Sequence, residues 1–206
     1  AQFSNPSSEY RTAPFMVWNG KVTEAEIDRM LKDFKDAGCG GAFIHPRPGM
    51  ITEYMSDEWY SLYRYAVDKG KEMGLDIWIY DENSYPSGFA GGHVPEEMPE
   101  SYNQGQGLAL TKTDLLPDKT DEYFIILKKE GDKWADITNA LSQHKKAKGE
   151  YYLYKKTYLG KSDWYGGYSY VDLLVPGVTE KFIDITMKGY EKSIQDEFGK
   201  SVFGIF

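Results

Sequence analysis

Two adjacent carboxylates end an apolar run near the middle of the chain, and a loop rich in aromatic residues and glycine follows. The apolar run covers residues 75–80, and Asp81 and Glu82 come directly after it. Acids at the carboxyl end of a buried strand occupy the position where α/β proteins usually carry out their chemistry. Flat rings near such acids are suited to a sugar ring, and this stretch supplies three of them: Tyr80, Tyr85 and Phe89. The pattern predicts a carbohydrate site.

The two acids have different expected roles. Glycoside hydrolysis typically needs two carboxyl groups, one that protonates the leaving oxygen and one that acts as nucleophile or activates water. Glu82 is the predicted catalytic residue because neighbouring aromatic rings would raise its pKa by desolvation. The alternative is that Glu82 binds sugar hydroxyls or fixes the loop. Strand alternation points Asp81 the other way, so we expect Asp81 to bind substrate or to serve as a structural or calcium-binding acid.

Polar residues also end the two preceding apolar runs. His45 and Arg47 follow the second run, where we expect them to bind hydroxyls or a carboxylate of a sugar. The alternative for His45 is a structural role with a hydrogen-bonded ring, and the alternative for Arg47 is a salt bridge to a neighbouring acid. Trp18 and Asn19 end the first run, and Trp18 is either a stacking platform for a sugar or a plug in the core. The 3 His and 1 Cys show no spacing typical of a metal site.

The elements that would carry these residues alternate between strands and helices. Apolar runs predict strands over 14–20, 41–45 and 75–80. Thr23 and Glu26 have capping-box spacing, and Ser56 precedes two acids, so each of these segments predicts the start of a helix. Strands that alternate with helices favour a parallel sheet with right-handed crossovers. The repeat length fits a (β/α)8 barrel or a doubly wound sheet.

The pattern of predicted secondary structure changes after residue 93. Short β-prone segments separated by turn residues predict antiparallel strands over 107–115, 123–129, 133–139, 150–159 and 169–175. Thr179 is the expected cap of a further helix, and an apolar strand over 201–206 follows. The expected organisation is therefore three βα units of a barrel over 1–93, a β-rich insertion after the third strand over 94–176, and a barrel helix and strand over 177–206.

Composition limits the possible partners. The chain of 206 residues is 41% hydrophobic and 16% aromatic, with a net charge of -8. That charge argues against nucleic acid, because phosphate contacts need clustered Lys and Arg. We expect Lys145, Lys146 and Lys148 to form a solvated loop. No apolar run approaches the ~18 residues of a membrane span.

Three motifs in order resemble a known family. They are Pro14-Phe15-Met16-Val17-Trp18-Asn19-Gly20, Gly41-Ala42-Phe43-Ile44-His45-Pro46-Arg47-Pro48-Gly49, and Tyr80-Asp81-Glu82-Asn83-Ser84-Tyr85-Pro86-Ser87-Gly88-Phe89-Ala90-Gly91-Gly92. Together they resemble the N-terminal part of the catalytic barrel of glycoside hydrolase family 106, the α-L-rhamnosidases and their bacterial relatives. The resemblance covers residues 14–93 and, loosely, 177–206.

The resemblance implies a TIM-like barrel in a secreted or periplasmic bacterial enzyme that acts on plant or host glycans. We expect no cofactor other than the calcium ion that Asp81 could bind. It also implies that the last strand runs on into an acidic loop. A barrel needs about 250 residues and eight strands. We therefore expect the remainder of the barrel, and one catalytic carboxylate, to come from a longer chain.

Two other classes of function compete with the hydrolase. A non-catalytic carbohydrate-binding protein on a degenerate or partial barrel would use the same aromatic and polar residues without an essential acid. An α/β oxidoreductase is disfavoured because no dinucleotide-binding fingerprint follows the first strand.

Overall fold

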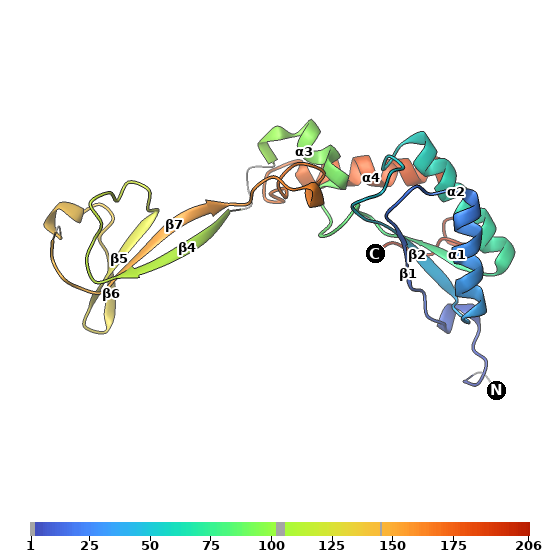
Figure 1. Cartoon of the computed structure of the whole chain (residues 1–206), viewed down its shortest axis with the longest axis horizontal. Coiled ribbons are helices and arrows are strands. Elements are labelled where there is room, and N and C mark those ends of the chain that lie inside the picture. Colours follow the sequence, from blue (N-terminus) through green and yellow to red (C-terminus); the bar gives the residue numbers. More distant parts are fainter. Residues whose placement is uncertain (1–2, 102–105, 145) are drawn as a thin grey trace. The chain divides into compact units, whose positions relative to one another are not determined.

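The computed structural model describes residues 3–101, 106–144 and 146–206, and the chain divides into two compact units (Figure 1). One unit combines Ala1–Tyr102 with Lys161–Phe206, and we name it the parallel-sheet unit. The other is Asn103–Gly160, the antiparallel-sheet unit. It is narrower than the expected insertion over 94–176, because the segments that flank it pack with the parallel-sheet unit.

Three short strands form the sheet of the parallel-sheet unit. They lie in the order β1 (Phe15–Trp18), β2 (Gly41–Pro46) and β3 (Asp76–Ile79). Both pairs are parallel, as the alternation of strands and helices predicts. All three carboxyl ends therefore lie at one edge of the sheet, which brings the polar residues that follow the strands to the same edge.

Two capped helices connect these strands. Helix α1 (Glu24–Asp36) begins after Thr23, whose side chain accepts a hydrogen bond from the Glu26 amide. Helix α2 (Asp57–Met73) begins after Ser56, whose side chain accepts from the Trp59 amide, and it ends at Gly74 in the left-handed conformation. The expected starts of both helices are confirmed, because side-chain caps satisfy amides that the first turn leaves unpaired.

The two faces of the parallel sheet differ sharply. One face is buried under α1 and α2 (Figure 1). On this face Trp18 packs edge-on against Trp59 at 5.1 Å between ring centroids. The opposite face, which we name the aromatic face, carries Phe15, Phe43 and Trp78, with Phe15 45% exposed. Phe43 lies 5.9 Å from Phe15 and 5.4 Å from Trp78 between ring centroids. Phe43 and Trp78 are half-buried, so this face is only partly open to solvent.

The end of the chain runs beside β3. The Ile77 amide donates to the Ser201 carbonyl and the Phe206 amide to the Ile79 carbonyl. Between this segment and β3, the described residues form a single parallel bridge, Ile79 to Ile205. The strand expected over 201–206 is therefore reduced to a bridge, and closure of the sheet into a barrel stays a prediction.

Two helices from opposite sides of the insertion complete this unit. Helix α4 (Val178–Ile194) begins after Gly177, which has φ +90°, so the expected cap at Thr179 is wrong. The short helix α3 (His93–Glu97) lies where the sequence predicts a loop. Helix α4 packs along α2, where the Tyr60 and Tyr190 rings meet edge-on at 5.6 Å.

The antiparallel-sheet unit has four strands in the order β4 (Gln106–Thr113), β7 (Tyr151–Tyr158), β5 (Ile125–Glu130) and β6 (Lys133–Asp136). Their antiparallel pairing agrees with the prediction from the turn-separated segments. The strand expected over 169–175 is not formed, and Val171 instead packs with Phe89 in a core of the parallel-sheet unit.

Short 3-10 turns occur in both units, at Ser8–Tyr10, Ala90–Gly92, Pro99–Ser101, Leu141–Gln143, Asp163–Tyr165 and Gln195–Glu197. Within the described ranges, every helix is too short or too polar to cross a membrane.

The contact between α2 and α4 gives a test of this packing. A Cβ at Gly189 would overlap the hydroxyl and ring of Tyr60. Helix propensity alone favours alanine over glycine by about 1 kcal/mol, but the forced displacement of a ring costs roughly 1–3 kcal/mol. We expect Gly189→Ala to lower the free energy of unfolding, measured by urea denaturation.

Gly20→Ala is the matched control, because a Cβ there meets no atom within 4 Å. Adding Tyr60→Leu should abolish the penalty of Gly189→Ala. A Gly189→Ala variant that is as stable as the parent protein would contradict this packing.

Candidate functional site

A single buried carboxylate organises the loop at the carboxyl edge of the parallel sheet. Both oxygens of Glu82 accept hydrogen bonds from backbone amides, with N···O distances of 2.6–3.1 Å. The side chain is fully buried. The five donors come from both limbs of the loop: Asn83, Gly88, Phe89, Ala90 and Gly91. Glu82 therefore ties the beginning of the loop to its end.

The loop holds residues in a backbone conformation that they rarely adopt. Ser84 has φ +98° and Ala90 has φ +49°, both in the left-handed region. Non-glycine residues in such conformations cost of order 1–3 kcal/mol and persist only where the surroundings hold them. The Glu82 carboxylate constrains Ala90, because it accepts a hydrogen bond from the Ala90 amide at 2.8 Å. Ser84 is held by its own contacts, since its carbonyl accepts from the Tyr80 hydroxyl and its amide donates to the Pro46 carbonyl.

The environment of Glu82 acts on its ionisation in two directions. Burial raises the pKa of the carboxyl to about 7, while hydrogen bonds from the amides, Gly91 foremost, lower it. Both oxygens of Glu82 are occupied by amides of the loop, and the side chain has no exposed surface. The geometry therefore favours the alternative role of Glu82, which is to fix the loop. The catalytic role of Glu82 stays a prediction.

Asp81 is the carboxylate that this loop leaves accessible. Its side chain is partly exposed, and its Oδ1 accepts a hydrogen bond of 2.6 Å from the Ser87 hydroxyl. Burial raises the pKa of Asp81, and the bond from Ser87 lowers it. Because Asp81 has an accessible oxygen and a raised pKa, it has the properties of a proton donor.

An arginine and two aromatic residues lie at the same edge. The Arg47 guanidinium lies over the Trp164 ring, 5.3 Å from the centroid. The Trp164 indole N–H donates to the Tyr85 carbonyl. The Tyr85 side chain is 62% exposed and Trp164 is 37% exposed, so both rings present surface to solvent. The structure thus brings predicted residues Arg47 and Tyr85 together with Trp164, which sequence reasoning missed.

Two residues expected to contact substrate lie in the core. Trp18 is 2% exposed, on the face of the sheet that the helices cover. Phe89 is fully buried and packs edge-on against Tyr165 at 5.3 Å. The burial of Trp18 favours its alternative role as a core plug, and that of Phe89 indicates a packing role.

Tyr80 and His45 are also buried, although on the aromatic face. The Tyr80 hydroxyl donates to the Ser84 carbonyl at 3.0 Å, and its ring lies 3.8 Å from that of His45. Neither ring nitrogen of His45 has a hydrogen-bond partner among the described residues. Burial first, and the charge of Arg47 second, lower the pKa of His45 to about 4. Asn19, by contrast, is exposed at the end of β1.

The possible calcium-binding role of Asp81 has no further support in the structure. In the part of the chain that the structure describes, no group of three or more His, Cys, Asp or Glu side chains is placed to hold a metal ion. The expectation of calcium at Asp81 stays a prediction.

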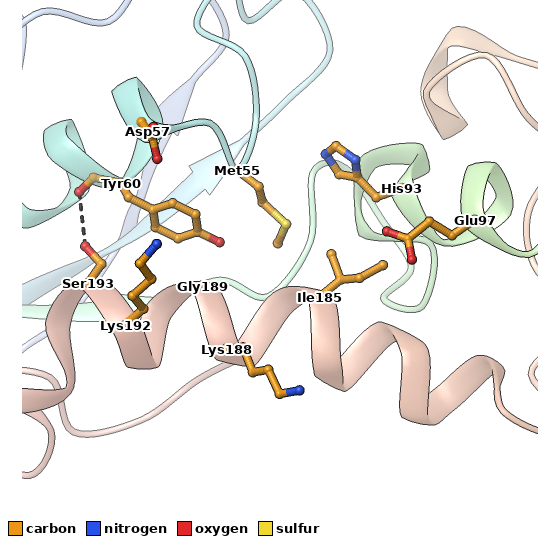
Figure 2. A pocket seen from close by; sticks show the side chains of 10 residues that line it. All are labelled: Met55, Asp57, Tyr60, His93, Glu97, Ile185, Lys188, Gly189, Lys192 and Ser193. Atoms are coloured by element: carbon orange, nitrogen blue, oxygen red, sulfur yellow. Dashed lines mark hydrogen bonds between the residues drawn. The ribbon is translucent and has the colours of Figure 1, made fainter.

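A separate pocket of about 550 Å³ opens between α2, α3 and α4 (Figure 2). Met55, Tyr60 and Ile185 line it together with the charged side chains of Asp57, Glu97, Lys188 and Lys192. Two of these charges are already neutralised, since Lys188 pairs with Asp184 and Glu97 pairs with Lys181. The strand-end cluster, which we define as Arg47, Asp81, Tyr85 and Trp164, is therefore the stronger candidate site.

The anchoring role of Glu82 predicts a stability effect. Glu82→Gln keeps one acceptor oxygen but places an NH2 group against amides that can only donate. Loss of hydrogen bonds to a buried charge should lower the free energy of unfolding by roughly 3 kcal/mol. Thermal and urea denaturation measure this loss. Asp81→Asn is the control, because asparagine can still accept the Ser87 bond, and equal stability of the two variants would contradict the role of Glu82.

The depressed pKa of His45 predicts a pH dependence. The unfolded chain takes up the proton near pH 6.5, but the folded protein does so only near pH 4. The contribution of His45 to stability is therefore complete above pH 6.5 and is lost as the pH falls toward 4, on the order of 2 kcal/mol. His45→Phe removes this titration. We would measure the free energy of unfolding of both proteins by urea denaturation from pH 7.5 to 4. As the pH falls, the free energy of unfolding of the variant should rise relative to that of the parent protein. A difference that stays constant with pH would contradict the prediction.

Comparison with known proteins adds a weak structural likeness. No protein-family model matches the chain, and no curated protein does. A solved structure, the rhamnosidase from Novosphingobium sp. PP1Y, matches 55% of this chain with a TM-score of 0.40 and 24% identity. The match spans 11% of that rhamnosidase. A similarity at this level carries no conclusion about function.

Proposed function

We propose that the chain is part of the catalytic domain of a glycoside hydrolase and that its strand-end cluster binds sugar. The observation that carries this proposal is the convergence of exposed rings, one cation and one accessible acid at the carboxyl edge of the parallel sheet. Trp164 and Tyr85 present ring surface, the Arg47 guanidinium lies over Trp164, and Asp81 lies two residues beyond the end of β3. Carbohydrates are bound by such combinations of apolar ring faces and charged hydrogen-bonding groups.

In this proposal Asp81 protonates the glycosidic oxygen. Its raised pKa keeps more of the carboxyl protonated than an ordinary aspartate would be. Arg47 and Asn19 hold hydroxyl groups, and Glu82 keeps Asp81 and Tyr85 in place through the loop. A second carboxylate is required, at ~5 Å for retention or ~6.5–9.5 Å for inversion of configuration. We propose that it comes from a further strand of the barrel.

The aromatic face is consistent with such a barrel. Phe15 is 45% exposed, and Phe206 at the end of the chain is 62% exposed beside it, with ring centroids 5.6 Å apart. In a (β/α)8 barrel the face of the sheet opposite the helices forms the packed interior. Further strands would cover these rings. The proposed substrate is a plant or host glycan, in a secreted or periplasmic bacterial protein.

The second candidate function is carbohydrate binding without hydrolysis. The specific observation in its favour is the saturation of Glu82, the acid that sequence reasoning places in catalysis, by five backbone amides. If Asp81 also only binds hydroxyls, the strand-end cluster is a recognition site.

Two substitutions separate binding from chemistry. Trp164→Ala removes a stacking surface and should weaken binding of neutral oligosaccharides, including rhamnose-containing ones, by about tenfold. In the longer protein that supplies the second carboxylate, Asp81→Asn should retain binding but lower the turnover of aryl glycosides by roughly 10² or more. Calorimetry and product release measure the two effects.

Tyr10→Ala is the control for Trp164→Ala, because Tyr10 is 77% exposed in the N-terminal segment. Sugar binding without turnover in the longer protein that includes the further strands would favour the recognition site. Equal binding by the Trp164→Ala and Tyr10→Ala variants would refute the strand-end cluster for both functions.

A further inference from the structure

The antiparallel-sheet unit has one covered face and one uncovered face. Ile126, Tyr151 and Leu153 point to the covered face and form a buried core. The residues that alternate with them make up what we name the outer face. This face is rich in exposed apolar and aromatic side chains, including Leu108 at 57%, Leu110 at 42%, Trp134 at 40% and Tyr158 at 59%.

The outer face is continuous across the strands. Tyr154 of β7 stands opposite Leu110 of β4 and Ile125 of β5. Along β7 itself, every second residue from Tyr152 to Tyr158 belongs to this face. That row is roughly 20 Å long at the rise of an extended strand. It is long enough to lie along several rings of a polymer.

Lysines lie among these rings. Lys112 lies over the Tyr152 ring at 4.7 Å, and Lys156 over the Phe124 ring at 4.4 Å. Neither lysine forms a salt bridge with an acid of the described residues. Trp134 extends the cluster, with its ring 4.1 Å from that of Tyr152. Exposed cations held against ring edges and faces are available to a ligand that carries negative charge.

The charge of this unit differs from that of the whole chain. Residues 103–160 hold ten Lys against eight Asp and Glu, a net charge of +2, whereas the chain carries -8. The four arginines of the protein all lie outside this range. Planar bidentate recognition of phosphates and bases relies on arginine. Lysine with tyrosine hydroxyls is better matched to separated carboxylates and to sugar hydroxyls.

We propose that the outer face binds an anionic polysaccharide, a glycan whose sugar rings carry carboxylates. Sugar rings pack on Tyr154, Tyr158 and Trp134, and the carboxylates meet Lys112 and Lys156. This site belongs to a different unit from the strand-end cluster, and the inference does not rest on the hydrolase proposal. It assigns the insertion a function of its own, retention of the protein on a charged polymer.

The test measures binding of the full chain to polygalacturonate, with its fully methyl-esterified form and poly(dT) as comparison polymers. We expect polygalacturonate to bind most tightly, with an affinity that falls as salt rises. Lys112→Gln combined with Lys156→Gln should weaken this binding about fivefold to tenfold. Tyr158→Ala should weaken polygalacturonate binding without changing the charge of the protein.

The matched control combines Lys128→Gln with Lys155→Gln, which removes the same charge from the covered side of the same sheet. Lys155 pairs with Glu122 and Lys128 with Glu130. Thermal unfolding verifies that each variant is folded, and Tyr10→Ala, in the exposed N-terminal segment, should leave polygalacturonate binding unchanged. Equal loss in the control, tighter binding of poly(dT), or equal binding of the esterified polymer would each overturn the proposal.

Discussion

The loop at the sheet edge depends on one buried charge and the five amides that solvate it. Without those donors, a carboxylate removed from water would be strongly unfavourable. Without the carboxylate, the amides of residues 88–91 would be buried without an acceptor. Each requirement satisfies the other, and the result fixes Asp81 and Tyr85 on the two sides of Glu82. The proposed chemistry therefore rests on a residue that need not touch substrate.

Local patterns predict the parallel-sheet elements well because their causes are local. Thr23 and Ser56 cap helices through their own neighbours, and three apolar runs become β1, β2 and β3. The role of Glu82 cannot be obtained in this way, since a catalytic acid and a buried anchor look the same until the backbone folds back. The nearest signal in the sequence is the glycines at 88, 91 and 92, which permit that return.

Contacts between distant segments account for the other differences between the sequence-based predictions and the structure. Trp164 contacts Arg47, although more than a hundred residues separate them in the sequence. No sequence pattern around either residue predicts this contact. The segment 169–175 has β-prone residues, yet Val171 is buried against Phe89 instead of pairing in a sheet. Thr179 is a good capping residue, but Gly177 adopts the turn that begins α4. In each case tertiary packing overrides a local preference.

The parallel-sheet unit is assembled from two stretches of chain separated by residues 103–160. During synthesis, the contiguous antiparallel-sheet unit can form as soon as it leaves the ribosome. The other unit must wait for α4, because Tyr190 packs against Tyr63 in its core. At ordinary translation rates this delay is on the order of ten seconds. Throughout that interval the nascent chain exposes an incomplete apolar core, which makes it a natural client for chaperones.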